Sequence, residues 1–370
     1  MRAYVLHGVN DLRYETVPDP APGEGEVLVA VKNVGVCGSD IPRIYQTGAH
    51  VHPLIPGHEF AGTVVDVGNA ADKGWLGKRA GVFPMIPCRQ CGPCREGRYE
   101  LCRNYDYLGS RRDGGFAELV AVPEGNLLLL PGEVSFREAA MLEPMAVAVH
   151  AMRRGLGMEL GGGAAKRAGG RAVTEQKGSK ERRTIAVCGL GTIGLFLLMF
   201  LKEAGCERVL ALGNKEFQRE EAASFGVSGE DYCDVRRTDG GAWLFGKTDG
   251  RGVDVFFECV GKNETFASAV GCTAPAGRVV LVGNPVSGMG LERDVYWKIL
   301  RNQLVVTGTW NSSFVHEASD DWHYVLKRLV EGRIHPEAMI SHRLSLSSLE
   351  RGLHVMRDKT EDYGKIMADL

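Results

Sequence analysis

The chain has 370 residues, enough for two domains of ordinary size. Hydrophobic residues make up 44 % and charged residues 24 %, as in an ordinary globular protein. The formal net charge of -2 disfavours a nucleic-acid or anionic-membrane partner, and the longest apolar run, 193–201, is too short to span a bilayer. We therefore expect no nucleic acid and no membrane among its partners.

The cysteines indicate the redox compartment. The opening residues MRAYVLHGVNDLRYE lack a charged stretch followed by an apolar one, so we expect no secretion signal. Of the ten cysteines, four have metal-ligand spacing and the others are scattered. This usage favours a reducing, cytoplasmic location and zinc thiolates rather than disulfides.

Residues 1–130 predict a mostly β domain. Short alternating runs such as EVLVAVKNVGVC and AGTVVDVG are separated by turns rich in proline and glycine. Within this region, the stretch 37–62 carries Cys37, His58 and Glu59. A thiolate and an imidazole supply two ligands of a zinc site. Taken singly, the three residues also fit a core thiol, a loop histidine and a helix-start acid.

The third zinc ligand is expected to be Glu143, because a carboxylate in the apolar run MLEP needs a cation. Three protein ligands leave a fourth position open, as a catalytic zinc requires. The surrounding segment 135–154 predicts a buried helix that carries Glu143 inward, with Ser135 as its N-cap.

A second metal site is predicted from four closely spaced cysteines in CRQCGPCREGRYELC. Four thiolates can surround one tetrahedral ion and leave no open position, so this metal should be structural and stabilise a lobe at about 86–104. A zinc-ribbon nucleic-acid module and an iron–sulfur cluster are the alternatives. The four residues are Cys88, Cys91, Cys94 and Cys102.

The segment 157–183 is rich in glycine, alanine and basic residues and has almost no large apolar side chains. Such a composition cannot bury enough surface to order itself, which predicts a flexible linker or surface loop. A basic binding patch is the alternative interpretation.

A dinucleotide-binding fold is predicted from residue 184 onward. TIAVC predicts a strand, and the following G-x-G-x-x-G opens an apolar helix, the context in which this motif binds a pyrophosphate. The helix N-terminus favours the anion. The motif residues are Gly189, Gly191, Thr192, Ile193 and Gly194.

The end of the second strand of this fold bears on cofactor choice. An acid that binds the adenosine ribose is expected there, but the chain has Gly213, Asn214 and Lys215. A small residue beside a cation leaves room and charge for a 2′-phosphate, which favours NADP over NAD. Alternatively, Lys215 is a solvated loop lysine and Glu216 reaches the ribose.

Further strands are predicted in 253–261, which includes the cofactor-site candidate Val260, and in 277–285 and 304–311. Alternation of strands and helices over 184–311 predicts a doubly wound parallel sheet with helices on both faces, a Rossmann domain. The expected organisation is an α/β chain with a β-rich catalytic domain at 1–156, the linker, the Rossmann domain at 184–311 and a return to the catalytic domain at 312–370.

Nearly the whole chain resembles the zinc-dependent medium-chain alcohol and polyol dehydrogenases. The resemblance rests on CGSD, GHE, the four-cysteine lobe, MLEP and the dinucleotide motif. GSRRDGGFAE, PRIYQTGAH and GTWNSSF are most similar to the galactitol-1-phosphate and sorbitol dehydrogenase branch. The resemblance implies that the β-rich domain is GroES-like. It also implies that Cys37, His58 and Glu143 hold a catalytic zinc, with Glu59 as an alternate or supporting ligand, and that the four cysteines hold a structural zinc.

The expected reaction is hydride transfer between NAD(P) and a secondary hydroxyl of a polyol or polyol phosphate, with Ser39 relaying the proton. Relatives often have a histidine soon after CGSD, where this chain has Pro42. A sugar phosphate needs cations, and these same side chains could instead be structural. The candidates are Arg43, Arg111, Arg112 and Lys298, with His50 and His52 as possible hydroxyl contacts.

Two other functions remain open. One is oxidation of an unphosphorylated polyol or secondary alcohol such as sorbitol, iditol or butanediol. The other is a non-catalytic redox sensor that binds zinc and dinucleotide. Relatives pair their dinucleotide domains through the last strand, and the apolar LVVTGTW predicts a homodimer or homotetramer here.

Overall fold

The computed structural model describes residues 1–158, 183–285 and 287–370. These residues form two compact units. Unit 1 comprises Met1–Pro144 and Phe314–Leu370, and unit 2 comprises Met145–Ser313. Unit 1 is therefore built from two distant stretches of sequence. Of the predicted linker at 157–183, residues 159–182 lie outside the described part of the chain.

The main sheet of unit 1 has seven strands centred on β3 (Glu26–Gly35), which pairs antiparallel with β4, β8 and β17. Val27, Val29 and Val31 of β3 alternate in sequence and are buried, as expected for a strand packed on a core. The remaining strands are β4 (Glu59–Val67), β5 (Arg79–Val82), β8 (Leu119–Pro123), β9 (Leu127–Leu129), β16 (Ile340–Ser345) and β17 (Lys365–Asp369).

Smaller elements complete unit 1. A hairpin of β1 and β2 and a short pair, β6 with β7, lie outside the main sheet. Leu349 and Leu353 of helix α11 are buried in the same core as the β3 valines. The bounds are β1 (Arg2–Gly8), β2 (Asp11–Thr16), β6 (Met85–Ile86), β7 (Asp106–Tyr107), α1 (Asp40–Tyr45), α2 (Gly92–Arg95), α10 (Asp321–Val330) and α11 (Leu349–Asp358).

The segment predicted as one helix forms two, α3 (Phe136–Ala140) and α4 (Leu142–Leu156). The predicted N-cap is confirmed: the Ser135 hydroxyl accepts the Glu138 N–H (3.1 Å), and the Glu138 carboxylate accepts the Ser135 N–H (2.8 Å). This capping box satisfies two N–H groups at the helix start. The interruption at Met141 places Glu143 in the first turn of α4.

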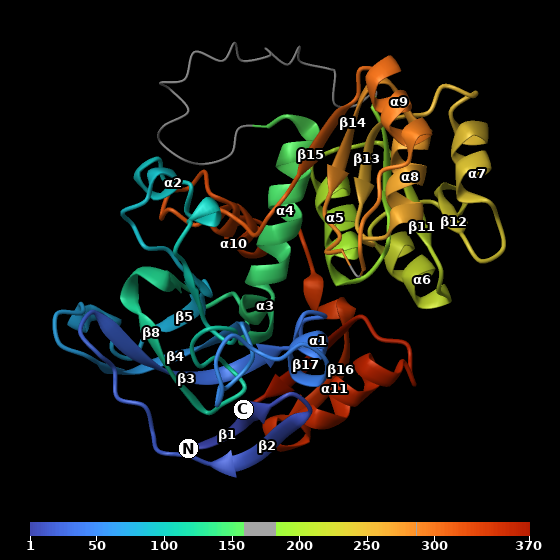
Figure 1. Ribbon diagram of the computed structural model, residues 1–370. Coiled ribbons are helices and arrows are strands. Elements are labelled where there is room, and N and C mark those ends of the chain that lie inside the picture. The colour runs from blue at the N-terminus through green and yellow to red at the C-terminus, as the bar shows by residue number, and fades with distance from the viewer. Residues whose placement is uncertain (159–182, 286) are drawn as a thin grey trace. The chain divides into compact units, whose positions relative to one another are not determined.

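Unit 2 is built on a six-stranded sheet in the order β12-β11-β10-β13-β14-β15, and each neighbouring pair is parallel. This order reverses between β10 and β13, which confirms the predicted doubly wound sheet. Figure 1 shows β13, β14 and β15 side by side. The strands are β10 (Thr184–Cys188), β11 (Arg208–Gly213), β12 (Tyr232–Asp234), β13 (Val253–Glu258), β14 (Thr273–Leu281) and β15 (Val305–Gly308).

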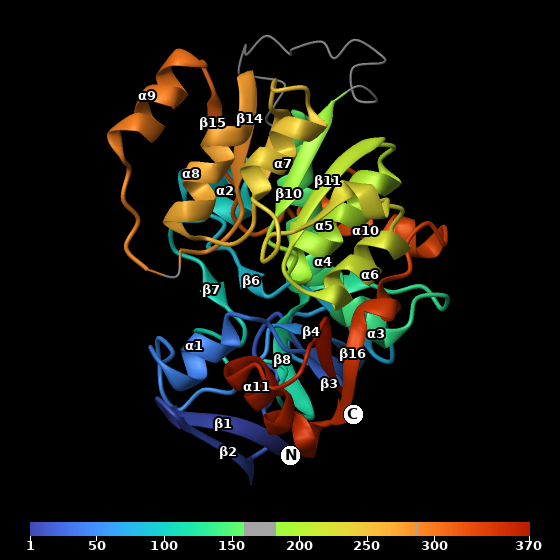
Figure 2. The same ribbon diagram turned by 90° about the vertical axis from the view of Figure 1, so that its right-hand side faces the viewer.

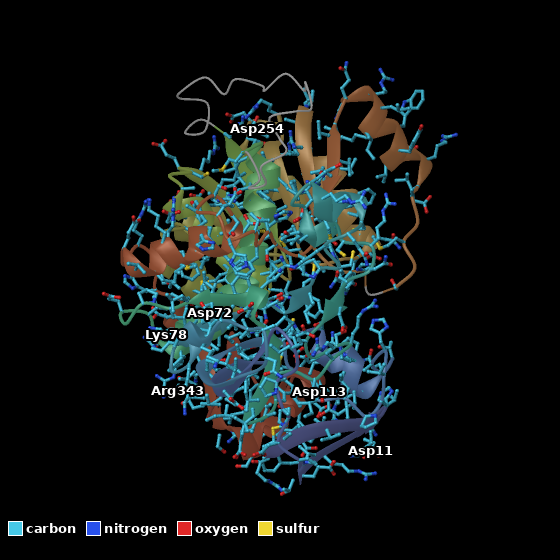
Figure 3. All side chains as sticks on the ribbon, turned by 90° about the vertical axis from the view of Figure 1, so that its left-hand side faces the viewer. Asp11, Asp72, Lys78, Asp113, Asp254 and Arg343 are labelled. Atoms are coloured by element: carbon cyan, nitrogen blue, oxygen red, sulfur yellow. The ribbon has the colours of Figure 1, made fainter. Side chains whose placement is uncertain are left out.

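The helices of unit 2 form two groups: α5 packs on α6, and α8 contacts both α7 and α9 (Figure 2). Figure 3 labels Asp254 of β13, whose carboxylate accepts the backbone N–H of Thr184 (2.8 Å) and so joins two neighbouring strands. The bounds are α5 (Thr192–Glu203), α6 (Glu216–Ser224), α7 (Gly240–Lys247), α8 (Asn263–Cys272) and α9 (Arg293–Arg301).

Four strands were not predicted from the sequence: β12 in unit 2, and β7, β16 and β17 in unit 1. Strand β12 has only three residues, too few for a clear alternation. No helix in the described ranges is both long and apolar enough to cross a bilayer.

Candidate active site

Three side chains of unit 1 converge at the start of β4. The ligand atoms of Cys37, His58 and Glu59 all lie within 4.8 Å of one another. The β3–β4 register pairs Gly35 with Glu59, so the pairing of the two strands brings the segment that begins with Cys37 next to His58. A thiol, an imidazole and a carboxylate are the donors that zinc favours.

Electrostatics around His58 favour a cation. Its Nδ1 is buried, lies 3.5 Å from Asp40 Oδ1 and makes no hydrogen bond within the described chain. Burial alone would lower the pKa of His58, but Asp40 and Cys37 together raise it well above its usual range. The site therefore attracts positive charge, and with Asp40 beside Nδ1 the other ring nitrogen of His58 is left for a metal.

Asp40 fixes the loop that carries Cys37. Its carboxylate is fully buried and accepts the Cys37 backbone N–H (3.0 Å) and an N–H of Arg43 (2.5 Å). Ser39, between the two residues, donates its hydroxyl to Cys37 Sγ (3.3 Å). Asp40 thus orients Cys37, His58 and Arg43 together, a role that the sequence reasoning missed although CGSD contains it.

Glu143, the predicted third ligand, lies outside the 4.8 Å group, whereas Glu59, predicted as the alternate, lies inside it. Tyr107 helps to hold Glu143 in this position, because the hydroxyl of this half-buried side chain donates to Glu143 Oε1 (3.2 Å). Burial raises the pKa of Glu143 to about 7, an effect that His58 opposes and Glu59 reinforces. Two carboxylates therefore border the Cys37–His58 pair.

Glu59 has a cationic partner of its own. Lys365 of β17 is 2 % exposed, donates to the Glu59 carboxylate and donates a second hydrogen bond to the Val36 carbonyl (2.9 Å). A buried carboxylate and ammonium tolerate burial only when paired in this way. Sequence reasoning missed Lys365, which lies 306 residues from Glu59 in a strand that was not predicted.

The four cysteines predicted to hold a structural metal converge in unit 1. Their sulfurs all lie within 4.8 Å of one another. Cys88 and Cys94 sulfurs are 4.0 Å apart, and those of Cys91 and Cys102 are 3.9 Å apart. These separations match the edges of a tetrahedron of thiolates around one zinc ion with bonds of about 2.3 Å. The residues present fit the ion.

The candidate phosphate-binding cations are mostly engaged elsewhere. Arg112 forms an ion pair with Glu26 (2.6 Å), Arg111 stacks on the Tyr105 ring (4.7 Å), and Lys298 of unit 2 donates to a backbone carbonyl. Arg43 uses one nitrogen on Asp40, and its other N–H groups make no hydrogen bond within the described ranges.

The turn that carries Arg111 and Arg112 has a structural function. Asp113, labelled in Figure 3, accepts the Ile55 backbone N–H (2.8 Å). A side chain at Gly114 would collide with the Gly57 carbonyl, so the DGG turn packs directly against the loop before His58. His50 and His52 are exposed, and a His52 ring nitrogen accepts the Ala49 N–H (3.4 Å). His52 therefore caps its own loop.

The glycine loop of unit 2 has the shape of a pyrophosphate site. Gly189 has φ +95° and contacts Val260, and a side chain at Gly194 would collide with the Gly189 carbonyl. Gly191, by contrast, faces open space, and Thr192 and Ile193 begin α5 immediately after it. Backbone N–H groups at this helix start can therefore approach an anion closely.

The end of β11 leaves no room for an acid. A side chain at Gly213 would collide with the Tyr232 hydroxyl and with Gln218. Gln218 also accepts the Asn214 N–H (2.8 Å), and Tyr232 donates to the Lys215 carbonyl (2.9 Å). The turn 213–215 is thus held by polar side chains where an NAD-binding fold places a carboxylate.

Comparison with known proteins agrees with this geometry. The family model for the alcohol dehydrogenase GroES-like domain matches residues 23–132, and that for zinc-binding dehydrogenases matches residues 192–331. The galactitol 1-phosphate 5-dehydrogenase of Escherichia coli K12 is 29 % identical over 348 residues, covering 92 % of this chain and 91 % of the relative.

The sorbitol dehydrogenase of Bacillus subtilis is 31 % identical over 292 residues, covering 77 % of this chain and 75 % of the relative. The crystal structure of galactitol-1-phosphate dehydrogenase from Escherichia coli superposes with a TM-score of 0.86 at 28 % identity and covers 100 % of both chains. With these matches, the two metal-ligand groups and the doubly wound sheet, the chain belongs to the zinc-dependent medium-chain alcohol and polyol dehydrogenase family of oxidoreductases.

Proposed function

We propose that this protein transfers hydride between a nicotinamide cofactor and a secondary hydroxyl of a polyol or polyol phosphate, giving a ketose. The observation that carries the proposal is the Cys37–His58–Glu59 group with Glu143 beside it. Cys37 and His58 would hold a catalytic zinc together with one of the two carboxylates. When bound, zinc supplies Lewis-acid polarisation that lowers the pKa of a substrate hydroxyl.

The chain's own residues would handle the proton and the charge. Ser39 is half-buried and hydrogen-bonded to Cys37, which suits it to receive the proton of the substrate hydroxyl. Glu143, held by Tyr107, would orient the substrate or complete the metal ligands. In unit 2 the glycine loop would hold the pyrophosphate. Four thiolates would hold the structural zinc.

Arg43 supports a phosphorylated substrate. It reaches the metal group through Asp40 and retains N–H donors that no side chain of the described chain uses. Guanidinium N–H groups bind phosphate in a bidentate manner. An unphosphorylated polyol is the second candidate, favoured by the Asp40–Arg43 pair, which already neutralises the arginine.

NADP is the proposed preferred cofactor. The packed Gly213 excludes the acid that selects NAD, and Lys215 is near enough in sequence to meet a 2′-phosphate. The Tyr232 hydroxyl donates to the Lys215 carbonyl and would thereby fix the backbone from which the Lys215 side chain extends.

Initial rates would test substrate and cofactor together. We expect zinc-loaded protein to oxidise galactitol 1-phosphate with kcat/KM at least about tenfold above that for galactitol, sorbitol or 2,3-butanediol, and to favour NADP over NAD. Arg43→Met should reduce kcat/KM for the phosphorylated polyol about 10- to 100-fold, since a hydrogen bond to a charged group is worth about 1.5–3 kcal/mol.

Arg111→Met is the matched control, because it removes an equal charge from a side chain stacked on Tyr105. Equal or higher rates with free polyols would assign the protein to the sorbitol type of dehydrogenase. A preference for NAD would contradict the argument from Gly213. No turnover with any alcohol and either cofactor would contradict the proposed function itself.

We also propose a homodimer formed through β15. This strand is the edge of the unit 2 sheet, and Val305 and Val306 on it are exposed, as are Tyr296, Trp297 and Leu300 of α9. An apolar sheet edge is prone to pair with another strand unless it is covered. A second copy, with its β15 antiparallel to the first, would cover it.

Analytical ultracentrifugation should therefore show a dimer or a larger even-numbered assembly for the wild-type chain. Val305→Lys combined with Trp297→Asp should yield monomer, because both changes place charge on this apolar surface. Leu76→Asp, which adds a charge at an exposed apolar residue of unit 1, is the control. A monomeric wild-type protein would refute the proposed pairing.

A further inference from the structure

Glu258, the last residue of β13, is a buried carboxylate without a cationic partner. It is 2 % exposed. Its Oε1 accepts the backbone N–H groups of Val260 (2.8 Å) and Gly261 (3.0 Å), and Oε2 accepts the Gly261 N–H at 3.2 Å. No lysine, arginine or histidine of the described residues pairs with it. Burying an unpaired charge is costly, so its presence here calls for a reason.

Three loops of unit 2 meet at Glu258. Its backbone carbonyl accepts the N–H groups of Val282 (2.8 Å) and Gly283 (2.9 Å), which follow β14. Val260, held by the Glu258 carboxylate, packs against Gly189 of the glycine loop after β10. Glu258 therefore lies where the loops at the carboxyl ends of β10, β13 and β14 come together.

This place is where a doubly wound sheet binds the middle and the nicotinamide end of a dinucleotide. Ligands bind outside the carboxyl ends of the strands at the point where the strand order reverses, here between β10 and β13. The half of the sheet formed by β10, β11 and β12 binds the adenosine end of the dinucleotide, so the half formed by β13, β14 and β15 binds the nicotinamide end. Glu258 is at the carboxyl end of the first strand of that second half.

The two redox states of the cofactor differ in charge at the ring. Oxidised nicotinamide is a cation, and reduced nicotinamide is neutral. A fixed anion in a poorly hydrated site attracts the cation and is indifferent to the neutral ring. The hydrogen bonds alone do not require an anion, because the single oxygen of a glutamine could accept the two N–H groups that Oε1 accepts.

We propose that the negative charge of Glu258 shifts the relative affinity of the cofactor site toward the oxidised nicotinamide. This inference rests on the proposed function, because it requires that unit 2 binds NAD(P). Glu258 acts as a specificity-determining residue between the two redox states of one cofactor. Its carboxylate does not need to touch the cofactor, because its charge acts across the loop that it holds. The same carboxylate fixes the positions of Val260 and Gly261 in that loop.

The test is a set of equilibrium titrations of the full-length protein with NADP, NADPH, NAD and NADH, followed by protein fluorescence. Glu258→Gln should lower the ratio of the reduced-form Kd to the oxidised-form Kd about tenfold, which corresponds to about 1.4 kcal/mol. Glu264→Gln, which removes the same charge from an exposed residue of α8, should leave the ratio unchanged.

ADP-ribose lacks the nicotinamide, so its binding reports the shape of the loop but not the effect of the Glu258 charge on the nicotinamide ring. Its Kd should be the same for the wild type and Glu258→Gln. If Glu258→Gln weakens ADP-ribose and both redox forms equally, the carboxylate is only a clamp for the loop and the inference is wrong. An unchanged ratio in a folded Glu258→Gln variant overturns it as well.

A second variant covers the case in which Glu258→Gln does not fold. Asn284 is exposed, and its backbone packs against Gly261. Asn284→Lys places a cation on the adjacent loop and should lower the ratio in the same direction, whereas Asn284→Gln should not. An unaltered ratio in Asn284→Lys would overturn the inference. If the wild type binds none of the four dinucleotides, the proposed function fails, which is a distinct result.

Discussion

Cys37→Ser is expected to reduce turnover at least about 10³-fold while the chain stays folded. A serine hydroxyl is a far weaker zinc ligand than a thiolate, so the catalytic metal should be lost or misplaced. The fold should survive because Cys37 lies in the half-buried loop after β3, and its backbone N–H keeps its bond to Asp40. Initial rates and zinc content per chain measure the effect. We expect about one zinc per chain in the variant and two in the wild type.

Two observations make this result specific. Cys206→Ser changes a buried thiol outside both metal groups and should keep two zinc ions and normal rates. Cobalt substitution adds a readout independent of activity, because the absorption due to a Cys37 thiolate–cobalt bond should disappear in the variant. Wild-type rates in Cys37→Ser would eliminate the zinc mechanism.

Cys94→Ser is expected to remove the other metal and to destabilise the lobe between β6 and β7. Binding of a structural zinc contributes about 10–16 kcal/mol in small zinc domains, so much of the order in such a lobe depends on its metal. Cys94 is buried, and its loss leaves three thiols that cannot close a tetrahedral site. Zinc content, thermal unfolding and limited proteolysis of the lobe would measure the change.

The visible spectrum of the wild-type protein distinguishes zinc from an iron–sulfur cluster at the four cysteines. A zinc site has no visible absorbance, whereas an iron–sulfur cluster is coloured, so the spectrum of the purified wild type decides between them. Ser110→Ala, a small change outside the four-cysteine group, serves as the control for Cys94→Ser. An unchanged melting temperature and zinc content in Cys94→Ser would show that the four cysteines hold no metal.

Features encoded by short-range spacing could be predicted from the sequence. The four cysteines lie within 15 residues of one another, and the glycine motif lies within six, so their geometry depends on local turns. The capping box at Ser135 is likewise local. The alternation of strands and helices was sufficient to predict the doubly wound sheet, because parallel strands need helical crossovers between them.

Features that depend on long-range pairing could not be predicted. Lys365 meets Glu59 only because β17 pairs with β3, and nothing near Lys365 in sequence indicates that a lysine there is buried. Tyr107 reaches Glu143 through the pairing of β6 and β7, each of two residues. These two contacts hold Glu59 and Glu143 where they lie beside Cys37 and His58, whereas the sequence reasoning put Glu143 ahead of Glu59 as the third ligand.

The position of Lys365 in the chain has a consequence for synthesis. Cys37, His58 and Glu59 leave the ribosome about 300 residues before the lysine that pairs with Glu59. Unit 2 is one continuous stretch and can fold in the meantime, since domains generally fold as units. Until β17 arrives, β3 lacks one of its neighbours and the carboxylate of Glu59 has no ammonium partner. The proposed metal centre of a nascent chain therefore gains this ammonium partner only after β17 has been synthesised, 306 residues after Glu59.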